Sequence, residues 1–257
     1  MSSAPSFIAS YARWRSSRLG QITDALEEQV LLELLGPVER LKLLDAGCGD
    51  GVLATKLAQL GARVTGLDPD ERMLDGARAR ARSNSVDLDL VRGRVEALPF
   101  PDASFDRVVA VTVLCFVEDA DRAVAEMARV LKPGGRLVLG ELGKLSLWAA
   151  IRRIRGWLGH ATWKAAHYRT AGQLRELLER HGLAVDELRG AIFYPPWGVA
   201  AALAAGIDKW LGTGMTIGAA FIAASATRWQ PSEDHAALTG ESVDWKADTR
   251  KPEAPTR

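Results

Sequence analysis

The sequence has few cysteines, no excess of charge of either sign and no long uninterrupted apolar run. Only Cys48 and Cys115 occur among 257 residues, too few for a disulfide framework. Lys and Arg number 33 and Asp and Glu 32, so the formal net charge is +1. Because this balance creates no strong electrostatic field, we expect no nucleic-acid partner.

We expect no targeting or membrane-spanning segment in this chain. The N-terminal residues MSSAPSFIAS lack the basic-then-apolar order of a secretory signal, which together with the scarcity of cysteine favours a cytoplasmic location. The longest apolar stretch of the C-terminal third, 197–207, is broken by Asp208 and Lys209 and is too short to span a bilayer. We expect this stretch to form a buried or lid helix.

Strand and helix patterns alternate along most of the chain. A helix is predicted over 24–35, with Asp24 as N-cap candidate and Gly36-Pro37 as its stop. Strands are then predicted at 41–45, 62–67, 87–92, 105–113 and 136–141, and helices at 51–60, 71–82 and 119–131. The pattern resumes with a helix at 170–181, an extended stretch at 184–194, a helix near 197–211 and an extended stretch at 217–228. This alternation predicts an α/β fold with a doubly wound parallel sheet.

One large domain with additions accounts for the length and for the 47% hydrophobic content. We expect a helical lid segment over 1–39, an α/β domain over 40–228 and a lid insertion at 143–169 within it. Residues 229–257 are polar and without period, which predicts a mobile tail.

A glycine turn flanked by two acids is the most informative motif. An apolar run ends in Asp45 and is followed by Gly47, Gly49 and Gly51, and the next apolar run ends in Asp68. The dinucleotide fingerprint has a different glycine spacing, and its pyrophosphate favours helix N–H groups over carboxylates. Asp45 suits the ammonium of a zwitterionic amino-acid moiety, and Asp68 is placed to accept hydrogen bonds from ribose hydroxyls. The motif therefore predicts a nucleoside crevice.

Four segments carry a family resemblance: LLDAGCGDG, VTGLDPDERMLDGARARA, GRVEALPFPDASFDRVVAVTVL and EMARVLKPGGRLVLGEL. Together they closely resemble the class I S-adenosylmethionine-dependent methyltransferases, in particular the branch that is similar to ubiquinone/menaquinone-biosynthesis methyltransferases. The resemblance implies a Rossmann-like seven-strand sheet with the last strand antiparallel. It also implies S-adenosylmethionine as cofactor and S-adenosylhomocysteine as product.

The resemblance also implies a set of cofactor-binding residues. These are Asp45, Gly47 and Gly49 at the methionine end, with Cys48 and Gly51 in the same turn, Asp68 at the ribose, Pro69 and Met73 at the adenine, and Val95 and Glu96 at the adenine edge. One departure is Arg94, where many relatives have an aspartate that accepts from the adenine amino group. Arg94 cannot accept a hydrogen bond. Either Glu96 or a backbone carbonyl takes that role, or Arg94 stacks on the adenine or points to solvent.

The acceptor site is less defined by sequence. Methyl transfer from a sulfonium has a neutral leaving group, so positioning supplies much of the rate and a dedicated base is optional. A phenol or carbon acceptor gains more from a base than a thiol does. The catalytic candidates are Tyr11, which would close on the methionine end, Glu141 at a strand end, and His167 as the preferred base. Each of them is also compatible with a structural role.

Aromatic and soft side chains are the candidates for the acceptor pocket: Trp14, Cys115, Trp148, Trp163, Tyr168 and Trp197. In the insertion, apolar residues recur at helical spacing, with arginines expected outside: Leu147, Ile151, Ile154 and Leu158 against Arg152, Arg153 and Arg155. This helix is either a cover packed on the sheet or a lid for an apolar acceptor. We expect no membrane contact because the patch is short. We also expect no metal site, because no Cys, Asp or Glu cluster completes the pair His160 and His167.

The sequence thus predicts an S-adenosylmethionine-dependent methyltransferase that acts on a small, apolar molecule. It leaves open the acceptor atom (O, S, N or C) and the oligomeric state. Two alternatives are a nicotinamide-dependent oxidoreductase and a non-catalytic cofactor-binding protein, the latter suggested by Arg94 and by Ala12, where relatives often carry an acid.

Overall fold

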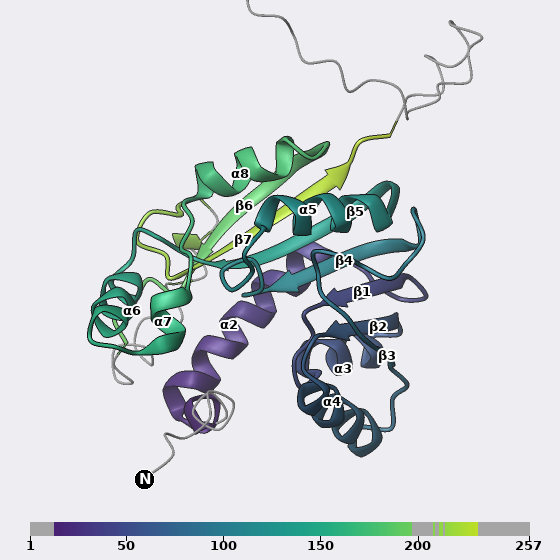
Figure 1. The fold of residues 1–257 in the computed structure, drawn as a ribbon, viewed down its shortest axis with the longest axis horizontal. Helices are drawn as coiled ribbons and strands as arrows, with labels where there is room; N and C mark the ends of the chain where they lie inside the picture. The colour runs from purple at the N-terminus through teal and green to yellow at the C-terminus, as the bar shows by residue number, and fades with distance from the viewer. Residues whose placement is uncertain (1–12, 197–207, 209–210, 213, 231–257) are drawn as a thin grey trace, which may run out of the picture.

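A seven-stranded sheet forms the centre of the molecule (Figure 1). The computed structural model describes residues 13–196, 208, 211–212 and 214–230. The strands are β1 (Lys42–Ala46), β2 (Arg63–Asp68), β3 (Asp89–Arg92), β4 (Phe105–Val111), β5 (Leu131–Leu142), β6 (Leu183–Ala191) and β7 (Phe221–Arg228). The helices are α2 (Arg18–Leu35), α3 (Val52–Gln59), α4 (Glu71–Ser83), α5 (Ala120–Val130), α6 (Leu147–Trp157), α7 (Ala161–Ala165) and α8 (Ala171–Glu179).

The strand order is β3-β2-β1-β4-β5-β7-β6, and β7 runs antiparallel to both of its neighbours. The predicted fold class is therefore confirmed. The order reverses between β1 and β4, which pair in parallel. In open α/β sheets, ligands bind at such a reversal beyond the carboxyl ends of the strands. The glycine turn that follows β1 lies at this position.

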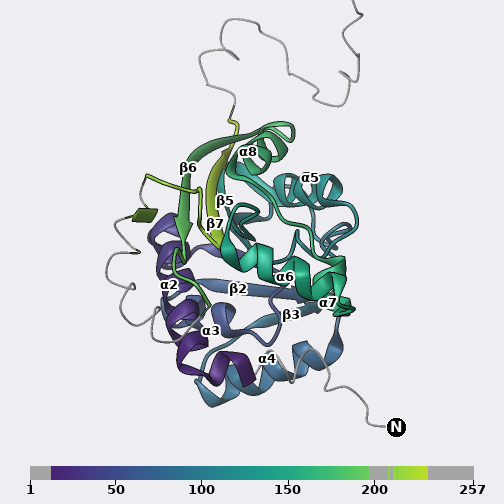
Figure 2. The ribbon, with the colours of Figure 1, turned by 90° about the vertical axis from the view of Figure 1, so that its left-hand side faces the viewer.

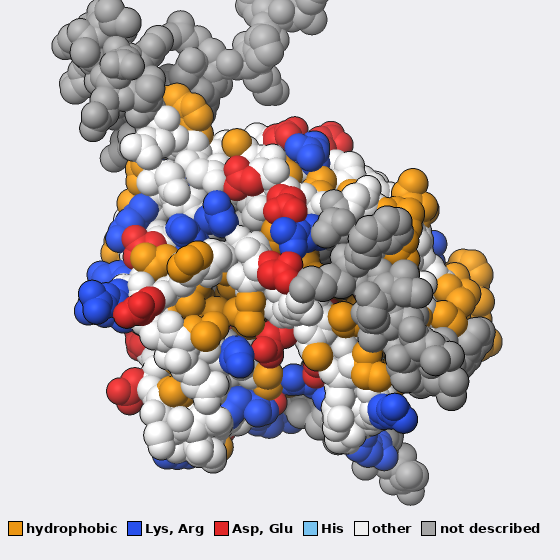
Figure 3. All heavy atoms as spheres, turned by 180° about the vertical axis from the view of Figure 1, so that it is seen from behind, with side chains coloured by type: hydrophobic (Ala, Val, Ile, Leu, Met, Phe, Trp, Pro, Cys, Tyr) orange, Lys and Arg blue, Asp and Glu red, His pale blue; other side chains and the backbone are white. Residues whose placement is uncertain are grey.

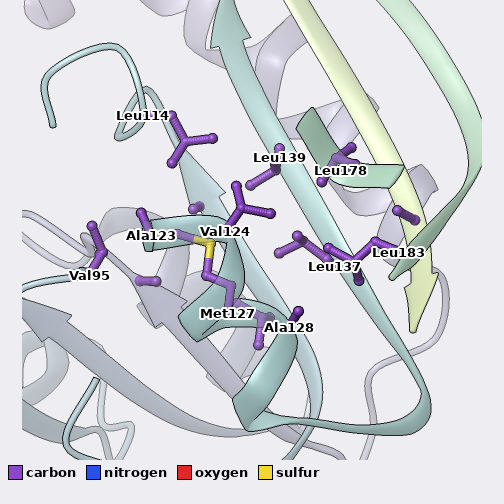
Figure 4. Close-up of a cluster of buried hydrophobic side chains, with 14 of the residues drawn as sticks. Val95, Leu114, Ala123, Val124, Met127, Ala128, Leu137, Leu139, Leu178 and Leu183 are labelled. Carbon is purple, nitrogen blue, oxygen red and sulfur yellow. The ribbon is translucent and has the colours of Figure 1, made fainter. Parts of the chain in front are cut away.

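Helices cover both faces of the sheet (Figure 1). On one face, α5 and α8 bury a core in which Val124 and Met127 pack near Leu137 and Leu139 of β5 (Figure 4). On the other face lie α2, α3 and α4, with Leu31 among the α2 residues that pack in the second core. Because both faces are covered, the central strands are apolar on both sides.

Helix α2 is longer than predicted. It begins at Arg18, and the Ser17 side chain caps it by accepting from the N–H of Gly20. The prediction of Asp24 as N-cap was wrong, because Ser17 caps the helix further upstream and Asp24 lies inside it. Gly36 ends the helix as predicted, with φ 67° and its N–H bonded to the Leu32 carbonyl.

Helices α6 and α7 of the insertion lie in front of the sheet when the molecule is turned by 90° from the view of Figure 1 (Figure 2). The predicted orientation of α6 was wrong. Leu147, Ile154 and Leu158 are exposed, whereas Trp148 and Gly156 are buried. A Cβ at Gly156 would lie 3.0 Å from the backbone of α7, so this glycine lets the two helices approach closely. The close contact fixes which face of α6 turns inward.

Some predictions fall on residues outside the described part of the chain. These are the helix near 197–211, apart from 208 and 211, the tail from residue 231 onward, Tyr11 and Trp197. Within the described ranges, no helix combines the length and apolarity needed to cross a membrane.

Candidate active site

The glycine turn after β1 is held against the end of β2. The N–H groups of Gly47 and Cys48 both donate to the Leu67 carbonyl, at 2.7 and 2.9 Å. Gly47 and Gly49 have φ values of 85° and 54°, in the region that favours glycine. A Cβ on Gly47 would lie 2.5 Å from Val113, but one on Gly49 would meet no atom within 4 Å. Gly47 thus allows close packing, and Gly49 presents its backbone to open space.

Two carboxylates, Asp45 and Asp68, flank this turn. Asp68 accepts from the N–H of Gly49 at 3.0 Å and from that of Asp70 at 2.9 Å. Asp45 is only 3% exposed, and its burial, together with the charge of Asp68, raises the pKa of Asp45 to about 7. A buried acid of this kind is stabilised in its charged form by a cation. The pair therefore suits a ligand that brings an ammonium and ribose hydroxyls.

An open cleft of about 770 Å³ lies between α2, the glycine turn and the end of β4. Its lining residues are Arg15, Asp24, Glu27, Glu28, Leu31, Asp45, Gly47, Cys48, Asp50, Val52, Leu53, Val111 and Thr112. Acidic and basic side chains line the hollow in the lower half of the space-filling view (Figure 3). Among the described lining residues, Arg15 is the one cation, and its Nε lies 2.5 Å from Asp24. The side chains that line the cleft thus include carboxylates that can pair with an ammonium and one guanidinium that can pair with a carboxylate, the two charged groups of an amino acid.

Glu27 of α2 is a site residue that the sequence pattern did not predict. Burial and the charge of Asp24 raise the pKa of Glu27 to about 8, against the opposing charges of Arg152 and Arg15. Glu27 stands one helical turn before the buried Leu31, on the apolar side of the helix. A charged residue on an apolar helix face was the signal that could have identified it.

At the predicted adenine end, Gly93 donates its N–H to the Asp68 carbonyl at 3.2 Å, so the segment that follows β3 lies beside the end of β2. Val95 is buried and Pro69 is exposed. Arg94 is exposed, and its Nη2 donates to Glu96 Oε1 at 2.9 Å. The side chain of Arg94 thus lies at the surface, paired with Glu96, and the group that accepts from the adenine amino group stays a prediction.

The loop after β4 is tied to β5 by Glu141. Its Oε1 accepts from the N–H of Leu114 at 3.0 Å, and Arg169 Nη1 lies 3.7 Å from Oε2. Burial raises the pKa of Glu141 to about 7. Cys115 is fully buried, and its carbonyl accepts from the backbone N–H of His167 at 2.8 Å, whereas the His167 side chain is exposed. Glu141 therefore contacts loop backbone, and its role as a catalytic group stays a prediction.

The aromatic candidates divide into two groups. Trp14 packs against the apolar cluster beneath α2. Trp148 is buried, with its Nε1–H donating to the Tyr194 carbonyl at 2.7 Å, and Trp163 and Tyr168 are partly buried. The three insertion aromatics surround arginines of α6, which the sequence pattern had placed on the outside of the helix.

Comparisons with known proteins identify the family of the chain. A family model of the methyltransferase domain matches residues 44–139. The chain is 32% identical over 190 residues to a ubiquinone biosynthesis O-methyltransferase from Methylobacterium sp. (strain 4-46), covering 71% of this chain and 76% of that enzyme. Because the match covers 71% of this chain, it extends well beyond the cofactor motifs.

Solved structures of methyltransferases have the same fold as this chain. An S-adenosylmethionine-dependent methyltransferase from Thermotoga maritima, described as a possible histamine N-methyltransferase, superposes with a TM-score of 0.67 at 26% identity, covering 86% of this chain and 96% of that one. A geranyl diphosphate C-methyltransferase from Streptomyces coelicolor A3(2) has a TM-score of 0.60 at 18% identity, covering 80% of each chain, which shows the fold alone. The names of the three similar proteins cover O-, N- and C-acceptors, so the fold does not define the acceptor atom.

The strand order and the matched methyltransferase domain place the chain among the α/β methyltransferases. The chain belongs to the class I S-adenosylmethionine-dependent methyltransferase family, with S-adenosylmethionine as its cofactor. The sequence left two alternatives, a nicotinamide-dependent oxidoreductase and a non-catalytic cofactor-binding protein. The methyltransferase relatives favour neither of them.

Proposed function

We propose that the protein is an O-methyltransferase that acts on the hydroxyl group of a small aromatic molecule. The observation that supports this most directly is the position of Glu27, a carboxyl of α2 that lines the same cleft as Asp45 and Gly47, where burial raises its pKa to about 8. A phenol gains from a proton acceptor that is ionised at the working pH, for Glu27 above about 8, and a thiol needs little help. The O-methyltransferase name of the Methylobacterium relative supports the same acceptor atom.

In this proposal the residues around the glycine turn hold the cofactor. Asp45 binds the ammonium, Arg15 the carboxylate, and Asp68 the ribose hydroxyls, and the open backbone at Gly49 allows close approach. Val95 and its neighbours border the adenine. Asp45 and Arg15 line the cleft, and Asp68 lies beside it, because its carboxylate accepts from the N–H of Gly49 in the glycine turn.

When bound, S-adenosylmethionine supplies a methyl group on a sulfonium, and its loss leaves neutral S-adenosylhomocysteine. Glu27 takes the hydroxyl proton of the acceptor as the oxygen forms its bond to the methyl carbon. Helices α6 and α7, together with α2, act as lids that exclude water from this region. The cytoplasmic location favoured by two unpaired cysteines stays a prediction.

Replacement of Glu27 tests the proposal. We expect Glu27→Gln to lower kcat about 10²- to 10⁴-fold on a phenolic acceptor with little change in cofactor affinity. The activity of the unmodified enzyme should fall as the pH drops below about 8, where Glu27 becomes protonated. Glu28→Gln is the matched control, because Glu28 lines the same cleft and its side chain is 37% exposed.

The measurement is the release of S-adenosylhomocysteine from a panel of phenols, amines and thiols. Methylation of amines or thiols in preference to every phenol, or a Glu27→Gln enzyme that keeps its kcat, would contradict the proposal.

A further inference from the structure

Arg152 lies between two indole rings at the inner face of α6. Its guanidinium carbon is 5.1 Å from the ring centroid of Trp148 and 4.9 Å from that of Trp163 on α7. The Trp148 ring is fixed by its hydrogen bond to the Tyr194 carbonyl. Two aromatic faces attract a cation and hold it in one place. The position of this charge is therefore defined by the packing of α6 on α7.

The positive charge of Arg152 acts on groups from three other parts of the site. It opposes the rise that burial causes in the pKa of Glu27 on α2, of Cys115 after β4 and of Tyr168 beyond α7. Arg152 thus lies where the N-terminal helix, the loop after β4 and the insertion meet. Because Glu27 lines the cleft in which we place the cofactor, Arg152 lies near one wall of that cleft.

Tyr168 provides a hydrogen-bond donor near the positive charge of Arg152. Its hydroxyl oxygen is buried and has no hydrogen-bond partner within the described part of the chain. Its ring faces a second arginine, with the guanidinium carbon of Arg153 at 5.3 Å from the centroid. A buried hydroxyl without a partner is costly, so a ligand group that accepts from it is favoured.

We propose that Arg152 and the hydroxyl of Tyr168 bind a carboxylate group on the methyl acceptor, so that the substrate is an aromatic acid. A guanidinium presents its N–H groups in a planar fork that matches a carboxylate. Trp148 and Trp163 provide aromatic surface beside that fork for the ring of the substrate. The inference deepens the proposed function and rests on it for the phenolic hydroxyl that receives the methyl group.

The test compares an acid with its neutral isostere. The probes are 3,4-dihydroxybenzoate and 3,4-dihydroxybenzamide, and binding is followed by quenching of tryptophan fluorescence in the presence of S-adenosylhomocysteine. The acid should bind at least tenfold more tightly than the amide. Arg152→Gln should abolish this preference, and Tyr168→Phe should reduce it several-fold. Arg155→Gln, which changes an exposed arginine on the same helix, should preserve it.

Melting temperatures of the variants show whether each one folds, and Tyr168→Phe gives an independent test if Arg152→Gln is unstable. Equal affinity for acid and amide in the unmodified enzyme, or a preference that survives in a folded Arg152→Gln variant, would overturn the carboxylate site. Equal O-methylation of both probes would remove the carboxylate site and leave the proposed function standing. Binding of the acid that depends on Arg152 but is not followed by methyl transfer to oxygen would support the carboxylate site and contradict the proposed function.

Discussion

S-Adenosylmethionine binding should weaken as the pH falls from about 7 to about 5.5, because Asp45 must be ionised to pair with an ammonium. Burial and the nearby charge of Asp68 raise the pKa of Asp45 to about 7. About half of the free protein therefore carries ionised Asp45 at pH 7, and about 3% does at pH 5.5. The affinity falls by the same fraction, about 16-fold or about 1.6 kcal/mol.

Over this range the ligand's own amino group stays protonated, because α-amino groups titrate at about 7.7 to 8.0. Titration calorimetry in two buffers of different ionisation enthalpy measures both the affinity and the protons released. Asp45→Asn should bind more weakly at pH 7 and show no such pH dependence. Asp50→Asn should keep it, because Asp50 lines the same cleft with its side chain 44% exposed. An affinity that is flat with pH in the unmodified protein, or an unchanged slope in Asp45→Asn, would rule out Asp45 as the partner of the ammonium.

Three further predictions concern cofactor affinity and stability. Asp68→Ala should weaken cofactor binding by about 1.5 to 3 kcal/mol, measured by calorimetry, because the ribose hydroxyls and the N–H of Gly49 lose a charged acceptor; unchanged affinity would remove Asp68 from the ribose site. Glu141→Ala should lower the free energy of unfolding by about 1 to 3 kcal/mol, because the N–H of Leu114 loses its buried partner; full stability with reduced kcat would instead place Glu141 in catalysis. Without cofactor, the free energy of unfolding should fall as the pH rises from about 4 to about 7, because the folded chain keeps protons on Asp45, Glu27 and Glu141 that the unfolded chain releases; Asp45→Asn should make this fall less steep in urea titrations, and an unchanged slope would contradict the raised pKa of Asp45.

The part of the site that is encoded locally was predictable from the sequence. Asp45, Gly49 and Asp68 lie at or just after the ends of apolar runs, where strand, turn and helix are set by neighbouring residues. The alternation of elements predicted a parallel α/β sheet, and the antiparallel last strand was implied by the family resemblance. The structure places these residues together at the reversal between β1 and β4. Their roles in binding the cofactor stay predictions.

The residues near the proposed methyl-acceptor site are positioned by the way the helices pack on one another. The spacing of apolar residues in the sequence does not show this packing. The apolar stripe of α6 predicted that Arg152 faces solvent, but Gly156 brings α7 close and turns the Trp148 side of the helix inward. Glu27 was missed because its importance comes from the docking of α2 over the glycine turn. His167, the preferred base, is exposed, since its backbone N–H and not its side chain bonds the loop after β4.

The most direct test of the account is to find which atom receives the methyl group. Purified protein would be incubated with methyl-¹³C-labelled S-adenosylmethionine and a small-molecule extract of cells that lack the gene, and the labelled product would be identified by NMR and mass spectrometry. If Glu27 serves as the base for a phenolic acceptor, the product is a labelled aryl methyl ether that does not form with Glu27→Gln. Label on nitrogen, sulfur or carbon, or an ether that forms equally well with Glu27→Gln, would contradict this role of Glu27.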